Sequence, residues 1–196
     1  MSLVNRAKGI LLNPKAEWPV IDTEPATVGS LYTGYIIPLA AIPAIASFVG
    51  LSVIGISVLG FSLRVPAGTA LTSAAVQYAL SLAGTFVLAL IIDALAPSFG
   101  GQKNQVQALK VAAYASTASW VAGLFLLLPS LAILAAIGGL YSLFLIFLGL
   151  PVVMKAPQDK AVGYTVVVIV VAVVLYFVIG VAVRQVAPYP LPGMMP

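Results

Sequence analysis

Long runs of apolar residues, separated by short polar stretches, dominate this chain. Residues 25–63 are 39 residues without a charged side chain, and residues 65–92 are a further 28. A helix crosses the hydrocarbon core of a bilayer with about 20 apolar residues, and it satisfies its own backbone hydrogen bonds in lipid. We therefore predict one transmembrane helix in each run, at residues 31–53 and 70–94.

The second half of the chain predicts three further spans. Residues 111–154 are 44 residues without a charge, which accommodates two spans of about 20 residues each. Pro129 marks the turn between them, because proline interrupts a helix. After the polar segment 155–160, a last apolar run predicts a fifth span. The predicted helices of this half are residues 108–128, 131–153 and 161–183.

The predicted fold class is therefore all-α, a polytopic transmembrane helical bundle of five spans. Residues 1–28 are expected to form a cytoplasmic amino-terminal segment with a short amphipathic helix, and residues 29–184 the five-helix domain. Residues 185–196 are a proline-rich carboxyl tail, expected to be irregular from Arg184 onward. The amphipathic helix has two open interpretations, since a helix on the membrane surface and one packed on the cytoplasmic face of the bundle share the same pattern.

The composition excludes most kinds of enzyme active site. Hydrophobic residues make up 62% of the chain and charged residues 7%, with no cysteine and no histidine. Disulfides, zinc sites with His or Cys ligands and Ser-His-Asp triads are therefore excluded. The net charge of +4 is scattered without a basic stripe, so we expect no nucleic-acid partner. We predict no catalytic residues, no cofactor, no metal site and no enzyme activity.

The positive charges predict the orientation in the membrane. Lysine and arginine gather in cytoplasmic loops, and seven lie on one side of the predicted spans against two on the other. This count places the amino terminus in the cytoplasm, and five spans then place the carboxyl terminus outside. The seven are Arg6, Lys8, Lys15, Lys103, Lys110, Lys155 and Lys160, and the two are Arg64 and Arg184.

Asp93 is the acidic residue nearest to a predicted span. An ionisable residue at membrane depth is by default a functional candidate, but the predicted topology puts Asp93 near the cytoplasmic end, where water can reach it. An interfacial role is favoured over an ion or proton site. Lys103 or Lys110 is the expected partner of its carboxylate.

Two helices carry mildly polar faces, and two carry small residues at four-residue spacing. Hydroxyl groups can bond within their own helix, so the polar faces do not require a solute path. The small residues favour close packing of helices within one chain over a dimer interface. The polar faces are Gln77, Tyr78, Ser81 and Thr85, and Tyr114, Ser116, Thr117 and Ser119; the small residues are Ala115, Ser119 and Gly123, and Ala135 and Gly139.

Three stretches, in this order, carry a resemblance to a known family. They are the Asn-Pro-Lys-Ala-Glu-Trp of residues 13–18, the segment 96–116 with Pro97, Gly100 and Tyr114, and the segment from Pro129 to Ala161. In these the chain resembles bacterial members of the Yip1 family, five-span membrane proteins with a cytosolic amino terminus. Family members often have a proline soon after the tyrosine-serine pair, where this chain has Ala118 and Ser119.

The resemblance implies a bacterial inner membrane location, and no settled activity. Eukaryotic relatives are linked to Rab-type small GTPases and vesicle traffic, but their long cytosolic extension has no counterpart here. The leading hypothesis is a membrane scaffold or adaptor, whose partners are the lipid bilayer and either a protein at the cytoplasmic loops or a second copy of the chain. The competing hypothesis is a small transporter or channel component. The candidate functional residues are Asp93, Lys103, Lys110 and Tyr114.

Overall fold

The computed structural model describes residues 2–58 and 61–186 of the chain. Within this part, five helical stretches are long and apolar enough to cross a membrane, which confirms the predicted all-α bundle of five spans. They are Val28–Ile54, Ala67–Phe99, Gln105–Leu127, Pro129–Val153 and Gln158–Gln185.

Several spans are built from more than one helical segment. The first joins α3 (Val28–Leu31), a π-helical turn (Tyr32–Ile36), α4 (Ile37–Val49) and a second π-helical turn (Gly50–Ile54). The second is α5 (Ala67–Leu95) with a 3-10 turn (Ala96–Phe99), and the third is α6 (Gln105–Ala115), α7 (Thr117–Ala122) and a 3-10 segment (Gly123–Leu127). The fourth is a 3-10 turn (Pro129–Leu131) with α8 (Ala132–Val153), and the fifth is α9 (Gln158–Val186).

The helix boundaries differ from the predictions in two instructive places. The third span breaks at Ser116, where the Ser116 hydroxyl donates to the Ala112 carbonyl oxygen and the Thr117 hydroxyl donates to that of Tyr114. Such bonds back to the preceding turn bend helices. The expectation that the chain becomes irregular at Arg184 was wrong, because α9 continues to Val186. Residues 187–196 of the predicted irregular tail lie outside the described residues.

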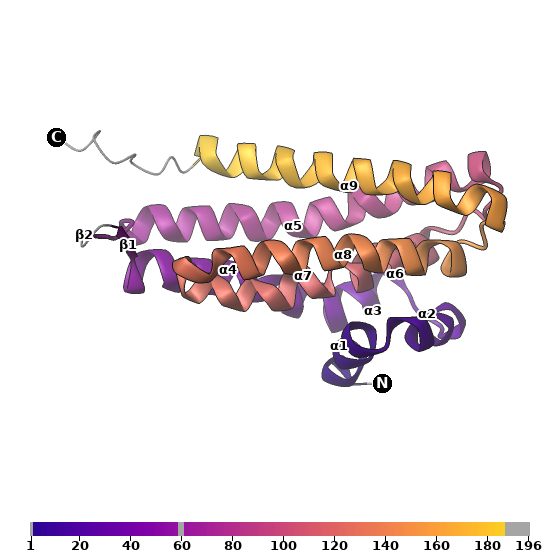
Figure 1. Ribbon diagram of the computed structural model, residues 1–196, viewed down its shortest axis with the longest axis horizontal. Helices are drawn as coiled ribbons and strands as arrows, with labels where there is room; N and C mark the ends of the chain where they lie inside the picture. The colour runs from indigo at the N-terminus through magenta and orange to yellow at the C-terminus, as the bar shows by residue number, and fades with distance from the viewer. Residues whose placement is uncertain (1, 59–60, 187–196) are drawn as a thin grey trace.

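A small antiparallel hairpin connects the first two spans. Its strands are β1 (Ile56–Val58) and β2 (Phe61–Leu63). Gly55, with φ of 84°, ends the π-helical turn before it, a conformation that glycine adopts without a steric penalty. The hairpin lies at the end of the bundle remote from α1 and α2 (Figure 1).

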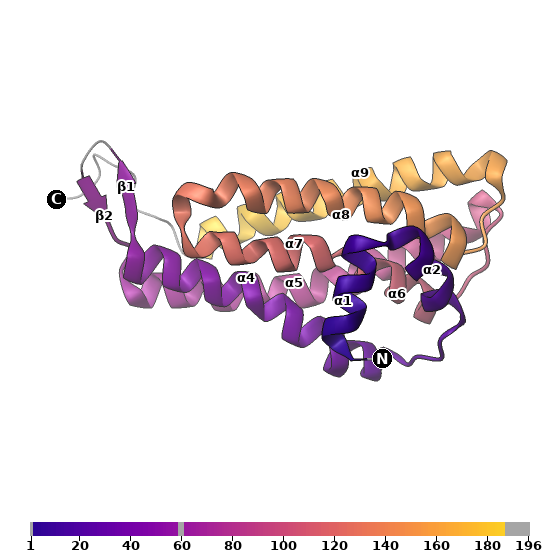
Figure 2. The same cartoon turned by 60° about the horizontal axis from the view of Figure 1, so that its bottom comes forward.

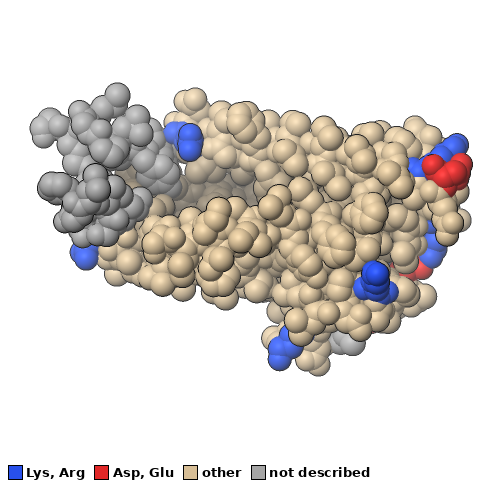
Figure 3. All heavy atoms as spheres, viewed as in Figure 1, with Lys and Arg blue, Asp and Glu red and all other residues tan. Residues whose placement is uncertain are grey.

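The long helices run side by side along the longest axis of the molecule (Figures 1 and 2). Two short helices, α1 (Leu3–Leu12) and α2 (Pro14–Thr23), lie against the flank of the bundle near one end (Figure 2). The connections 96–104 and 154–157 belong to the same end (Figure 1). Charged side chains lie at the two ends of the bundle and on the protruding helical pair α1 and α2, and the face of the long helices seen between them is uncharged (Figure 3).

The third span forms the centre of the bundle, and the fifth lies at its edge. Of the most apolar window of each span, 72% is buried in the third and 11% in the fifth. Every residue from Ala108 to Ala118 is buried, and most of them are small. Small side chains allow the neighbouring helices α5 and α8 to approach α6 closely.

The small residues of the fourth span give a matched test of this packing. A Cβ atom at Gly138 would lie 2.1 Å from the Cβ of Ala122, whereas one at Gly139 meets nothing within 4 Å. The close-packing residue of α8 is thus Gly138 and not the predicted Gly139. We expect Gly138→Ala to lower the free energy of unfolding by about 1–3 kcal/mol through overpacking, and Gly139→Ala to leave it unchanged or slightly raised. Equal losses in detergent unfolding titrations would contradict this packing.

Candidate functional site: a buried ionic network and an intramembrane cavity

Residues at the start of each helix favour the formation of α1 and α2. The Ser2 side chain accepts a hydrogen bond from the Asn5 backbone and so caps α1. Pro14 takes the first position of α2, where its missing N–H costs nothing. Between the helices, Gly9 leaves room for Glu17, since a Cβ at Gly9 would lie 2.6 Å from the Glu17 carboxyl carbon. The sequence analysis predicted one helix here and missed α2.

Arg6 is the centre of the ionic network beneath this helical pair. Its side chain lies on the buried face of α1, with 3% of the residue exposed. The guanidinium donates to the carboxylates of Glu17 and Glu24, which forms two ion pairs. It also lies over the ring of Tyr114, 5.6 Å from the ring centroid, within range of a cation–π interaction.

Lys110 holds the end of α2 from the opposite side. The residue is 3% exposed, and its ammonium donates to the backbone carbonyl oxygens of Ile21 at 2.8 Å and Glu24 at 2.6 Å, with Asp22 at 3.4 Å. The last carbonyls of a helix have no partner within it and carry the negative end of its dipole. A buried ammonium at this position therefore satisfies the end of α2 and ties it to α6.

Asp22 completes the network. Its carboxylate forms an ion pair with Lys155 in the turn before α9 and accepts from the Gln107 amide at 3.0 Å. The network then holds three cations, Arg6, Lys110 and Lys155, and three carboxylates, those of Glu17, Asp22 and Glu24, so it is electrically neutral. It joins the amino-terminal helices to both α6 and the α8–α9 turn.

Close packing reinforces the ionic contacts. The indole of Trp18 is buried against Gly149 of α8, where an added Cβ would lie 2.3 Å from the Trp18 ring. The Tyr141 hydroxyl donates to the Leu11 carbonyl oxygen at 2.8 Å. Of the two interpretations of the amino-terminal segment, the structure therefore has the helix packed against the bundle.

The structure brings two of the four candidate residues together and separates the other two. Lys110 and Tyr114 lie in the network with Arg6. Lys103 is exposed, and among the described residues neither it nor Lys110 forms an ion pair with Asp93. The expected partnership was wrong because the Lys110 ammonium points to the end of α2. Asp93 is buried, with one carboxylate oxygen lacking a hydrogen-bond partner in the described structure.

The acidic partners of Arg6 were missed as functional residues. Glu17, Asp22 and Glu24 are not among the candidate functional residues that the sequence predicted. One signal was available, since Arg6 falls at the helical spacing of Leu3, Ala7 and Ile10, on the apolar face of α1. A charged side chain on the buried face of an amphipathic helix needs a partner of opposite charge, because burying an unpaired charge is unfavourable.

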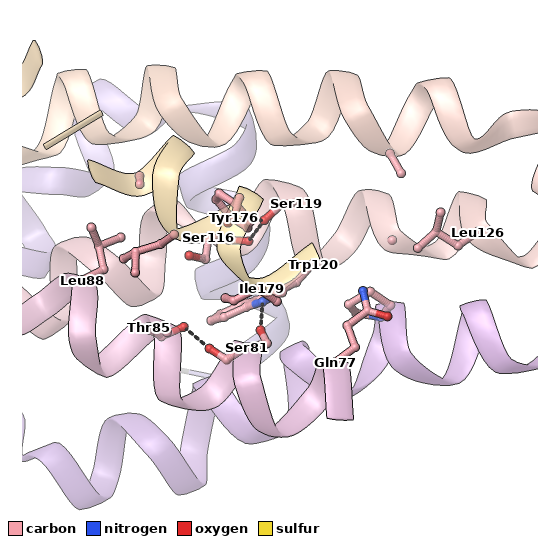
Figure 4. Close-up of a pocket in the computed structure, with 16 residues that line it drawn as sticks. Gln77, Ser81, Thr85, Leu88, Ser116, Ser119, Trp120, Leu126, Tyr176 and Ile179 are labelled. Atoms are coloured by element: carbon pink, nitrogen blue, oxygen red, sulfur yellow. Dashed lines mark hydrogen bonds between the residues drawn. The ribbon is translucent and has the colours of Figure 1, made fainter. Parts of the chain in front are cut away.

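A second feature lies within the membrane-spanning part, where the two predicted polar faces meet. A cavity of about 190 Å³ is lined by Gln77, Ser81 and Thr85 of α5 and by Ser116 and Ser119 of the third span (Figure 4). Trp120 Nε1 lies 3.4 Å from the Ser81 hydroxyl, and the Ser119 and Tyr176 hydroxyls lie 3.3 Å apart. The other lining residues are Pro43, Gly84, Leu88, Gly123, Leu126, Ala135, Ala172, Leu175 and Ile179.

The cavity does not extend to Asp93. Leu88 is the lining residue of α5 closest to it in sequence, and Asp93 does not line the cavity. The described residues thus form a recess between helices to which Asp93 does not contribute.

The sequence matches the Yip1 domain over residues 8–180, which covers α2, part of α1 and all but the end of the fifth span. The chain belongs to the Yip1 family. It is therefore an integral membrane protein of that family, as the resemblance implied. The ionic network and the cavity both lie within the Yip1 domain, apart from Arg6, which precedes the matched residues.

Two curated relatives are similar to this Yip1 family protein over most of its length. Both are named inner membrane protein YohC, one from Escherichia coli strain K12 and one from Escherichia coli O6:H1. Each is 26% identical over 161 residues, which cover 80% of this chain and 83% of the relative. No solved structure matches this chain.

Proposed function

We propose that this Yip1 family protein is a scaffold or adaptor of the bacterial inner membrane, without enzyme activity, and that α1 and α2 are its contact surface for a cytoplasmic protein. We call these two helices the platform. The observation that carries the proposal is the neutral ionic network, which fixes the platform on the bundle in one position. A surface ordered before binding loses less entropy when a partner binds.

The outward face of the platform has the composition of a contact surface. Val4, Leu12 and Val20 expose 56%, 82% and 41% of their surface, and Lys8 and Lys15 are exposed beside them. The three carboxylates of the segment are engaged by Arg6, Lys155 and the Gln107 amide. The platform therefore presents apolar residues and positive charge, which favours an acidic partner.

Orientation and location support the same proposal. The platform lies at the end that holds the loops with Lys103 and Lys155, and positively charged loops favour the cytoplasm. The relatives are named inner membrane proteins, which agrees with a bacterial inner membrane location. We therefore place the amino terminus in the cytoplasm.

Site-directed crosslinking in native membranes tests the proposal, because a chain without cysteine accepts a single one cleanly. A photo-crosslinker on Leu12→Cys is expected to give a discrete protein adduct, which is lost when Lys8 and Lys15 are both replaced by glutamate. The control is Ile133→Cys, 67% exposed on α8, which is expected to contact lipid and give no such adduct. Crosslinks to lipid alone at Leu12, or an adduct indifferent to the charge reversal, would contradict a protein-binding platform.

A small transporter or channel component is the second candidate, because the cavity joins the polar faces of two spans. A solute path through it would be blocked by filling the cavity with Ala135→Phe. Unchanged flux and growth under ionic stress in this variant and in Asp93→Asn would remove the transporter hypothesis.

A further inference from the structure

The intramembrane cavity opens sideways toward the lipid. In the space-filling view the surface is hollowed between α9 and α8, toward the end that carries Arg184 (Figure 3). Ala135 of α8 and Tyr176 and Ile179 of α9 line the cavity, and Tyr176 is 49% exposed. Gly139 of α8 has no neighbour that an added Cβ would meet within 4 Å. A molecule dissolved in the bilayer can therefore reach this recess.

The lining combines apolar walls with hydrogen-bond donors that have weak partners or none. The Gln77 amide makes no hydrogen bond among the described residues, Trp120 Nε1 lies 3.4 Å from its acceptor, and the Tyr176 hydroxyl lies 3.3 Å from that of Ser119. A polar group without a partner in hydrocarbon costs several kcal/mol. An oxygen acceptor bound inside the cavity would satisfy these donors.

The position and charge of the lining restrict the ligand. None of the lining residues is charged, so nothing there compensates a phosphate. Gln77 lies ten residues after the start of α5 at Ala67, about 15 Å along the helix at 1.5 Å per residue. Half of a hydrocarbon core of about 30 Å is the same distance. This depth suits an uncharged group and not a phospholipid headgroup.

The size admits the head of a lipid and the beginning of its chain. A dry cavity of about 150 Å³ in another protein binds benzene, and this one measures about 190 Å³. The apolar lining includes Leu126, Leu175 and Ile179, and the last two belong to α9, which borders the opening. The rest of a hydrocarbon chain can leave through that opening into the bilayer.

We propose that the cavity is a binding site for an uncharged lipid whose carbonyl oxygen accepts hydrogen bonds from Gln77, Trp120 and Tyr176. The carbonyl can belong to the ester of a diacylglycerol or to the ring of a quinone, because both are neutral acceptors on long hydrocarbon chains. This site is separate from the platform, and the proposal does not rest on the scaffold function.

The test uses the full chain in phosphatidylcholine nanodiscs that contain a diacylglycerol with a diazirine in its acyl chain. After illumination, labelling is expected on peptides of α5 and α9 that line the cavity. Ala135→Phe fills the cavity and is expected to reduce this labelling at least fivefold. Ala136→Phe, at the neighbouring lipid-exposed position, is the matched control and is expected to label as the unchanged protein does. Gln77→Leu removes a donor without adding a charge and is expected to reduce labelling severalfold.

Two further arms identify the head of the ligand. A phosphatidylglycerol with the same diazirine chain is expected to leave the cavity peptides unlabelled. The second arm adds a long-chain quinone at equal membrane concentration. If the quinone binds the cavity more tightly than the diacylglycerol, it is expected to suppress labelling by the diacylglycerol. If the diacylglycerol binds more tightly, its labelling is expected to persist. Equal labelling by both diazirine lipids, labelling indifferent to Ala135→Phe, or labelling confined to the control face would overturn the proposal.

Discussion

Arg6→Ala is expected to lower the free energy of unfolding by about 3 kcal/mol and to release the platform from the bundle. Removing one partner of a buried ion pair leaves an uncompensated charge and typically costs 3–5 kcal/mol. Here the two carboxylates of Glu17 and Glu24 would face each other without a cation. We expect the lower end of that range, because 40% of the Glu24 side chain is exposed and water can stabilise its charge.

The matched control for Arg6 is Lys8→Ala on the exposed side of the same helix. It is expected to change the free energy of unfolding by less than about 0.5 kcal/mol. Arg6→Lys keeps the positive charge but removes the planar guanidinium. Lysine therefore tests whether hydrogen-bond geometry, and not charge alone, is needed to bind both carboxylates. Hydrogen exchange of residues 3–23 measures release of the platform, and similar exchange in the Arg6→Ala and Lys8→Ala variants would show that the network does not hold it.

Lys110→Met has the second largest expected effect, a loss of about 2 kcal/mol. Methionine keeps much of the side-chain length but leaves the carbonyl oxygens of Ile21 and Glu24 without their donor. Hydrogen bonds to a charged group contribute about 1.5–3 kcal/mol, and part of the loss is offset because no ammonium has to be desolvated. Backbone exchange at residues 20–26 should rise first, since these residues end α2.

Lys103→Met serves as the control because Lys103 lies in the connection just before α6 and is exposed. It is expected to unfold as the unchanged protein does. If the two lysine variants lost the same free energy, the contribution of Lys110 would be general surface charge and not its bonds to α2.

The sequence predicted the spans because membrane crossing depends on length and apolarity, which can be read without tertiary contacts. The interval 111–154 divided at Pro129 as expected, and the third span broke at Ser116 because local hydroxyl bonds bend it. Helix ends were less predictable. Arg184 was taken as the limit of the fifth span, but α9 continues past it to Val186 because a single charge near water does not end a helix.

The ionic network could be predicted only in part, because its contacts join residues far apart in the chain. Lys110 and Tyr114 were singled out by their type and position, but their partners Glu24 and Arg6 lie more than 80 residues away in sequence. The polar faces of α5 and the third span were predicted separately. Their meeting in one cavity depends on how the helices rotate and pack, which no local pattern specifies.

The most direct test of the account is the side of the membrane on which the platform lies. Single cysteines at Ala16 of the platform, at Ser98 and at Asp159 would be compared with one at Ser130 by labelling intact spheroplasts with a membrane-impermeant maleimide. The account predicts labelling at Ser130 alone until the membrane is permeabilised, after which the other three react. Labelling of Ala16 in intact spheroplasts would place the platform outside the cytoplasm and contradict the proposed scaffold.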